Sequence, residues 1–241
     1  SRSFLLQNNV ALYGGFPAGG SSLDARDWEE NKTVLSGDII QRRTELVENP
    51  LQVSTGNSIH VVSGLTVDAS AVLDGFYINA GYAPSGGTGR TDDGAGIFLE
   101  GSSPTLANLV IIANVASGNG GGLINYDDGL PNLVNVVFRN NRANNGAGMY
   151  NQSGNPTLDR IKFLGNQASS SGGGMYNFTG TSPKITNSEF RGNVSLGGIS
   201  GIQGGGALYN VAGSAGGGPV LTNILFSGNR AVANSGRGGA I

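Results

Sequence analysis

The sequence predicts an all-β protein folded as a right-handed parallel β-helix, a coil of short strands stacked turn upon turn. Three observations support this fold class: a pattern written five times, apolar residues at fixed places in each copy, and abundant glycine. The copies are spaced 27, 25, 27 and 36 residues apart and begin at Pro104, Pro131, Pro156, Pro183 and Pro219. A period of this length is typical of stacked units that cannot bury their apolar faces alone.

Three apolar columns define the side chains expected to fill the interior. They lie two, seven and twelve places after each proline, whereas the residue six places after it varies from Val110 to Lys162 and Glu189. Fixed columns beside free ones indicate one buried and one exposed face of very short strands, and the spacing of an amphipathic helix is missing. The columns are Leu106, Leu133, Leu158, Ile185 and Leu221, then Ile111, Phe138, Phe163, Phe190 and Phe226, then Ala116, Ala143, Ala168, Ser195 and Ala231.

Turns of about 25 residues must stack in parallel, because each copy occupies the same place in the next turn of the coil. Adjacent turns would then lie about 4.8 Å apart. Parallel crossover connections are right-handed in nearly all known cases, which predicts the hand of the coil. Glycine would let the wall of the coil approach closely where no side chain fits.

Three columns of asparagine accompany the apolar ones. Asparagine tolerates the left-handed backbone region of a sharp bend, and stacked asparagines can also donate to and accept from one another as a ladder. Recurrence at fixed offsets favours the ladder. The columns are Asn114, Asn141, Asn166, Asn193 and Asn229, then Asn108, Asn135, Asn187 and Asn223 with Arg160 as the exception, then Asn125, Asn151, Asn177 and Asn210.

The whole chain is expected to form a single β-helix domain of about eight turns. Residues 1–103 form irregular opening turns with a polar loop at 16–32, and residues 104–241 form the five regular repeats. Ile78, Gly81 and Ala83 fit the phenylalanine, asparagine and alanine columns loosely. Insertions near residues 196–203 and 211–218 account for the longest spacing. Because the chain starts and stops within the pattern, we expect a piece of a longer chain or a unit that stacks end to end.

Composition excludes several classes of protein. Glycine supplies 43 of 241 residues, and charged residues make up 12% of the chain, against about 25% in ordinary globular proteins. A net charge of -2 offers no electrostatic footprint for nucleic acid or anionic membrane. The absence of cysteine excludes disulfides and thiolate metal sites. The chain contains no run of about 20 apolar residues, so the sequence predicts no transmembrane helix.

Short motifs in the repeats resemble those of a known family. Phe-Leu-Gly-Asn at 163–166, Phe-Arg-Gly-Asn at 190–193, Phe-Ser-Gly-Asn at 226–229 and Gly-Gly-Ala-Ile at 238–241 resemble the paired FxxN and GGA[ILV] repeats of chlamydial polymorphic outer-membrane proteins. The resemblance covers about residues 94–241. More broadly, the chain is similar to right-handed parallel β-helix proteins of the pectate-lyase-like superfamily.

The resemblance implies a large secreted or surface-displayed passenger, and the superfamily also contains polysaccharide lyases and hydrolases. The opening residues, with Tyr-Gly-Gly-Phe at 13–16 and Leu-Ser-Gly-Asp at 35–38, resemble the start of many large secreted bacterial β-helix proteins.

Groups able to perform catalysis are sparse. Asp92–Asp93 and Asp127–Asp128 are the adjacent aspartate pairs, and we expect them at opposite ends of neighbouring strands as solvated loop charges. Asp68 and Asp74 lie near Arg90 in sequence, but the repeat does not place the three on one face.

Isolated residues also favour structural roles. The single histidine, His60, lies in an alternating run and is interpreted as a partly exposed strand residue. The single tryptophan, Trp28, is interpreted as clamping its loop to the coil rather than as a platform for carbohydrate. Glycine runs such as 172–174 lack the Lys-Ser/Thr and helix of a phosphate loop. Chance explains the glycosylation patterns at Asn31, Asn151, Asn177 and Asn193.

Two hypotheses for function remain. The leading one is a non-enzymatic extracellular β-helix module of a bacterial surface protein: an adhesin, an autotransporter-like passenger or a structural fibre or filament segment. The alternative is a lyase or hydrolase acting on an acidic polysaccharide. We assign no catalytic, cofactor-binding or metal-binding residues and no cofactor. Expected partners are other copies of the chain, stacked end to end or side by side, or glycans or proteins of a host or cell surface, and not nucleic acid.

Overall fold

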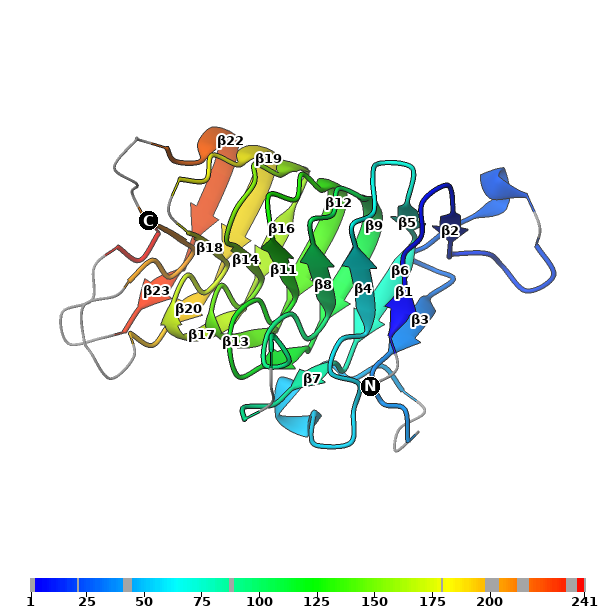
Figure 1. The fold of residues 1–241 in the computed structure, drawn as a ribbon, viewed down its shortest axis with the longest axis horizontal. Coiled ribbons are helices and arrows are strands. Elements are labelled where there is room, and N and C mark those ends of the chain that lie inside the picture. The colour runs from blue at the N-terminus through cyan, green and yellow to red at the C-terminus, as the bar shows by residue number, and fades with distance from the viewer. Residues whose placement is uncertain are drawn as a thin grey trace.

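Short strands of successive turns lie side by side in three parallel sheets in the computed structural model (Figure 1). The structure describes residues 3–20, 22–40, 45–86, 89–178, 180–197, 204–211, 217–232 and 238–240. Every pairing between neighbouring described strands is parallel, so the predicted all-β parallel β-helix is confirmed. We name the sheets A, B and C in the order in which one turn of the chain visits them.

Each turn contributes one stretch to each sheet, except that no described strand of the first turn lies in sheet C. Sheet A contains β1 (Phe4–Leu5), β4 (Val62–Leu65), β8 (Ile97–Glu100), β11 (Leu123–Tyr126), β14 (Met149–Asn151), β18 (Met175–Asn177) and β21 (Leu208–Asn210). Sheet B contains β2 (Ala11–Tyr13), β3 (Thr33–Ser36), β5 (Val72–Asp74), β6 (Phe76–Asn79), β9 (Thr105–Ile112), β12 (Asn132–Arg139), β15 (Thr157–Asp159), β16 (Lys162–Leu164), β19 (Lys184–Arg191) and β22 (Val220–Ser227). Sheet C contains β7 (Tyr82–Ala83), β10 (Val115–Ala116), β13 (Arg142–Asn145), β17 (Gln167–Ser171), β20 (Val194–Ser195) and β23 (Arg230–Ala231).

The seven strands of sheet A mark seven successive turns of the described chain. A further turn begins at residues 238–240, because the amide of Ala207 donates to the carbonyl of Gly239 and that of Leu208 to Ala240. Two 3-10 helices, η1 (Leu23–Ala25) and η2 (Pro50–Gln52), lie in the connections of the first turn.

The strand register confirms the apolar columns of the repeat. Leu133 pairs with Leu106 and Leu158, and Phe138 pairs with Ile111 and Phe163. The looser opening alignment also holds, since Ile78 pairs with Ile111 and Ala83 with Ala116. Columns two and seven places after the proline lie an odd number of residues apart, so strict strand alternation would place them on opposite faces.

A bend inside each sheet B stretch resolves this conflict. Asn108 has φ 51° and Asn135 has φ 55°, both in the left-handed region, and Arg160 takes the same conformation with φ 55°. Each bend resets the alternation, so that Leu106, Leu109 and Ile111 are all fully buried. Asparagine suits these positions because its short polar side chain tolerates this backbone conformation.

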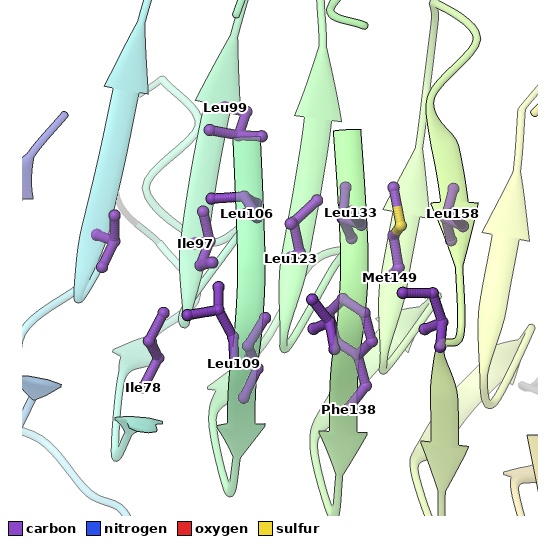
Figure 2. Packing of buried hydrophobic residues seen from close by; sticks show 14 of the residues in the cluster. Ile78, Ile97, Leu99, Leu106, Leu109, Leu123, Leu133, Phe138, Met149 and Leu158 are labelled. Atoms are coloured by element: carbon purple, nitrogen blue, oxygen red, sulfur yellow. The ribbon is translucent and has the colours of Figure 1, made fainter. Parts of the chain in front are cut away.

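The interior lies between the sheets as continuous columns of apolar side chains. Figure 2 shows Ile97, Leu123 and Met149 of sheet A beside Leu106 and Leu133 of sheet B, with Leu158 in the next turn. Farther along, the phenylalanine rings stack on one another through successive turns. Ring centroids lie 4.9 Å apart for Phe138 and Phe163, 4.6 Å for Phe163 and Phe190, and 5.2 Å for Phe190 and Phe226.

The glycine runs provide room for these rings. A Cβ atom on Gly148 would lie 2.7 Å from Cδ1 of Phe163 and 2.5 Å from the carbonyl oxygen of Gly174. No side chain fits there, because real Cβ contacts of this kind are far longer. The run therefore brings the wall of sheet A against the edge of the phenylalanine stack.

An asparagine ladder crosses the corner between sheets B and C, as predicted for the asparagine column that begins at Asn114. The side-chain oxygen of Asn166 accepts from the main-chain and side-chain nitrogens of Asn141, both at 3.0 Å. The side-chain nitrogen of Asn166 donates to Asn193 at 3.0 Å and to the carbonyl of Phe138 at 2.9 Å. The same pattern begins at Asn114 and ends at Asn229.

The ladder continues toward the N-terminus in reduced form. Gly81 has no side chain, yet its amide donates to the side-chain oxygen of Asn114 at 2.9 Å. Leu35 pairs with Ile78, and the same register carried three residues further places Asp38 beside Gly81. The segment Leu-Ser-Gly-Asp at 35–38 is therefore the first-turn counterpart of the later Phe-x-Gly-Asn motifs.

Loops of the opening turns anchor onto the outside of sheet B. Trp28 packs, half-buried, against a separate cluster that includes Val47, Tyr77 and Ile112, which confirms its interpretation as a clamp. The guanidinium of Arg26 lies 2.8 Å from the carboxylate of Asp74 at the end of β5, and this ion pair holds the polar loop to sheet B.

We predict that Asn166→Ala lowers the free energy of unfolding by about 2–5 kcal/mol, because the buried main-chain N–H of Asn141 loses its acceptor and the carbonyl of Phe138 loses its side-chain donor. Urea denaturation would measure the loss. Asn144→Ala is the matched control, because this exposed side chain accepts one hydrogen bond, from Ser169. Equal stability of the Asn166→Ala variant and the wild type would show that the ladder is not stabilising.

Candidate functional site

Residues 84–96, between β7 and β8, bring two of the predicted loop charges together. The guanidinium of Arg90 lies 3.9 Å over the ring of Tyr126 and forms ion pairs with Glu100 at 3.0 Å and Asp127 at 3.3 Å. The Tyr126 hydroxyl donates to Asp93, whose other oxygen accepts from an amide of the next turn. We call these five residues the Arg90–Tyr126 cluster.

The cluster confirms one part of the expectation for the aspartate pairs and corrects another. Asp93 precedes β8 and Asp127 follows β11, so they lie at opposite ends of neighbouring strands as expected, yet Asp93 binds Tyr126 and Asp127 binds Arg90 in one cluster. Asp93 is buried rather than solvated. The repeat could not reveal this, because an irregular loop places Arg90 over the neighbouring turn.

The chemistry of the cluster is that of a structural contact. Burial raises the pKa of Tyr126 above its ordinary value, and the hydrogen bond to Asp93 raises this pKa further, so the phenol stays protonated at neutral pH. Burial also raises the pKa of Asp93. Both carboxylate oxygens of Asp93 already accept hydrogen bonds, so neither is positioned to take a proton from a bound substrate.

His60 packs beside this cluster. Its ring centroid lies 4.7 Å from that of Phe98, and its Nδ1 lies 3.1 Å from the carbonyl oxygen of Gly94. A carbonyl can only accept, so Nδ1 bears the hydrogen in this contact. Burial lowers the pKa of His60. The residue is half-exposed, as the sequence predicts, but it lies before β4 rather than within a strand, so that part of the prediction is wrong.

The other acidic candidates lie apart. Asp68 accepts hydrogen bonds from Ser70, which lower the pKa of its carboxyl group. Asp74 binds Arg26 and the side chain of Asn108. Neither contacts Arg90 through any hydrogen bond or ion pair found in the described part of the chain, in agreement with the sequence analysis.

The glycine runs and the glycosylation patterns also receive structural explanations. The amides of Gly172 and Gly174 donate to carbonyls of the next turn, so these groups are engaged in the sheet. Asn151, Asn177 and Asn193 are fully buried and closed to a glycosylating enzyme, whereas Asn31 is half-exposed.

The described residues contain no group of three or more His, Asp or Glu side chains able to hold a metal ion together. Among the same residues, no helix has the length and apolar character needed to cross a membrane.

The structure contains an open furrow at the corner between sheets B and C, which the repeat pattern does not predict. It encloses about 420 Å³ between a segment of the first turn, Glu48–Pro50, and the outside of later turns, where Arg142, Gln167 and Val194 line it. Asn140 donates to the carbonyl of Glu48 at 3.2 Å, and Arg139 forms an ion pair with the Glu48 carboxylate at 2.9 Å. We call this hollow the corner furrow.

A second hollow of about 310 Å³ runs beside the corner furrow on the outside of sheet C. Arg142 and Gln167 line both hollows and form the ridge between them. A third hollow of about 400 Å³ lies on the outside of sheet B among Arg160, Lys162 and Glu189. Outward positions vary freely from turn to turn, so the repeat holds no signal that could locate these hollows.

The fold is that of a parallel β-helix protein. Most of the polar residues considered as candidates for catalysis instead hold loops to the coil. No protein-family model, curated protein or solved structure matches the chain. The resemblance to polymorphic outer-membrane repeats therefore stays a prediction from its motifs.

We predict that the stability of the fold decreases as the pH falls below about 6.5, the ordinary pKa of histidine. The lowered pKa of His60 means that the folded chain binds this proton less tightly than the unfolded chain does. The stabilisation is therefore complete above pH 6.5 and lost progressively below it. Urea denaturation across this range would measure the slope.

The matched variant is His60→Gln, which cannot titrate and should lose the part of the slope that histidine contributes. Because the chain has one histidine, its NMR titration is unambiguous. A titration midpoint at or above 6.5 in the folded protein would contradict the prediction.

Proposed function

We propose that the chain is a non-enzymatic β-helix module of a bacterial surface protein, an adhesin, autotransporter-like passenger or fibre segment located outside the cell. The observation that best supports the proposal is the unbroken internal ladder from Asn114 to Asn229. Successive turns are joined by main-chain hydrogen bonds and by a hydrogen bond between two asparagine side chains. In the later turns a phenylalanine ring also stacks on the ring of the next turn. Such a coil is suited to act as a stiff rod.

A stiff rod holds a binding surface away from its point of attachment. Six steps between the seven described turns correspond to roughly 29 Å of rod at the ordinary strand spacing. Extended concave or flat surfaces of stacked repeats are a common means of binding partners. Length and stiffness, rather than a closed catalytic pocket, are the properties that this construction favours.

The outer faces also support a binding role. Lys162 pairs in register with Glu189, and Glu189 with Leu225, so one outward column changes from cationic to anionic to apolar over three turns. The inward neighbour keeps phenylalanine throughout the same turns. Outer side chains can therefore diversify without disturbing the core, which is what surface recognition by a repeat protein requires.

The rival hypothesis is a lyase or hydrolase for acidic polysaccharides, and it rests on analogy of fold. A lyase needs carboxylates that converge on a cation and a base within reach of the substrate. The nearest arrangement is the Arg90–Tyr126 cluster, where Asp93 is occupied by Tyr126 and Asp127 by Arg90. This engagement favours the non-enzymatic proposal.

We predict no turnover of polygalacturonate, alginate or other acidic polysaccharides, with or without calcium. Absorbance of unsaturated uronates would detect lyase activity, and a reducing-sugar assay would detect hydrolysis. A pectate lyase of known activity is the positive control. Calcium-dependent product that disappears in Asp93→Asn would support the rival hypothesis and overturn the proposal.

We predict that protease added to intact cells of the source bacterium digests this chain, because a surface module faces the medium. Mass spectrometry of released peptides from residues 94–241 would measure it, with a cytoplasmic protein as the control for lysis. Digestion only after the cells are broken would refute the surface location.

A further inference from the structure

The corner furrow combines a charged group, a free amide and a bounded hollow. Arg142 is the first residue of β13 and lines the furrow. It is half-buried and forms no ion pair with a carboxylate of the described chain. Of the other arginines in the described chain, exposed Arg230 also lacks such a partner, whereas five are paired with carboxylates of Asp or Glu: Arg26, Arg90, Arg139, Arg160 and Arg191. A half-buried guanidinium without an anion favours an anionic ligand, because its fork of donors matches a carboxylate.

The wall facing Arg142 is already neutralised. Glu48 is the acidic residue of the furrow lining, and its carboxylate lies 2.9 Å from the guanidinium of Arg139. Its carbonyl accepts from Asn140, which holds this segment against the corner. The wall is therefore anchored at two points, and the local charge beside Arg142 is positive.

The remaining lining suits an extended main chain. Gln167 lies next to Arg142 in register, and no hydrogen bond from its side-chain amide was found within the described residues. Val194 follows Gln167 in the next turn, and Pro50 faces them from the opposite wall. An amide beside apolar side chains can bind a peptide group and pack a neighbouring aliphatic side chain.

We infer that the corner furrow binds an extended peptide segment of a protein partner through an aspartate or glutamate side chain that pairs with Arg142. This inference names a ligand class for the proposed surface module and rests on that proposal. Arg142, Gln167 and Val194 belong to three successive turns, so two turn-to-turn steps separate Arg142 from Val194, about 10 Å. That distance matches about three residues of an extended peptide, each about 3.3 Å long.

A glycan is the less favoured ligand. Sugar rings commonly pack their C–H faces on aromatic side chains, and none of the residues lining this furrow is aromatic. The lining instead places the amide of Gln167 and the aliphatic side chain of Val194 one turn apart along the rod. A short extended peptide uses both kinds of group at the spacing the turns provide.

The test is retention of the purified chain on immobilised pentapeptides. One library fixes glutamate at the centre with random flanking residues and blocked ends, and the matched library fixes glutamine there. We expect selective retention on the glutamate library. We also expect Arg142→Gln to reduce the apparent affinity of selected peptides roughly tenfold or more, the effect of losing one charge-assisted hydrogen-bonded pair.

Lys184→Gln is the control variant, because it removes one positive charge from an exposed residue of sheet B that does not line the furrow. It should bind as the wild type does. Urea midpoints of both variants establish that they are folded, and Gln167→Ala provides a second variant within the furrow that keeps the charge. Its binding should weaken while preference for glutamate over glutamine persists.

Equal retention on both libraries would overturn the inference, as would unchanged binding by Arg142→Gln or binding of oligogalacturonate in place of peptides. These outcomes leave the proposed function intact, because protease digestion on intact cells and the polysaccharide assays do not depend on Arg142. Conversely, a positive polysaccharide assay would refute the proposed function whatever the peptide libraries show.

Discussion

The buried asparagine ladder is the constraint on which the rest of the coil depends. Each of its fully buried amides, from Asn114 to Asn193, must meet the amide of the next turn, because an unpaired polar group in the interior is costly. This requirement keeps every turn in register at the corner between sheets B and C. The stacked rings of Phe138, Phe163 and Phe190 follow from the same register, since they lie three residues before the ladder.

Insertions are accepted only where they leave this register intact. The additional residues of the opening turns lie in connections, and they return to pack outside the coil through Trp28, Arg26 and Arg90. In Figure 1 these loops surround the N-terminal turns, whose strands are shorter than those of β12 and β19. The coil therefore separates two tasks: repeated columns maintain the stack, and irregular loops shape its outer surface.

That separation explains why the charged clusters and hollows lie on the outer surface of the coil. Within the core, every turn presents nearly the same atoms to the next, which leaves little freedom for a specialised site. On the outside, Glu48 of the first turn meets Arg139 and Asn140 of the fourth, and this contact forms one wall of the corner furrow. The Arg90–Tyr126 cluster likewise joins a loop of one turn to a strand of the next.

The sequence by itself determined the parallel stack, the inward columns and the principal ladder, because a repeated pattern must place equivalent residues above one another. It also indicated the clamp role of Trp28 and the exposure of His60. Only the tertiary structure revealed the left-handed bend at Asn108, Asn135 and Arg160, which places two oddly spaced columns on one face. The asparagines of this column have both roles, because they also form amide hydrogen bonds between turns, from Asn135 to Asn108 and from Asn223 to Asn187.

The tertiary structure also decided the surroundings of Asp93 and Arg142. Asp93 was expected in solvent, but a loop with no repeat carries it onto Tyr126 of the following turn. Arg142 occupies a freely varying column, and its furrow exists because Glu48–Pro50, distant in sequence, packs against Asn140. Repetition constrains contacts between equivalent residues, whereas contacts between a loop and a distant turn depend on the folded path of the chain.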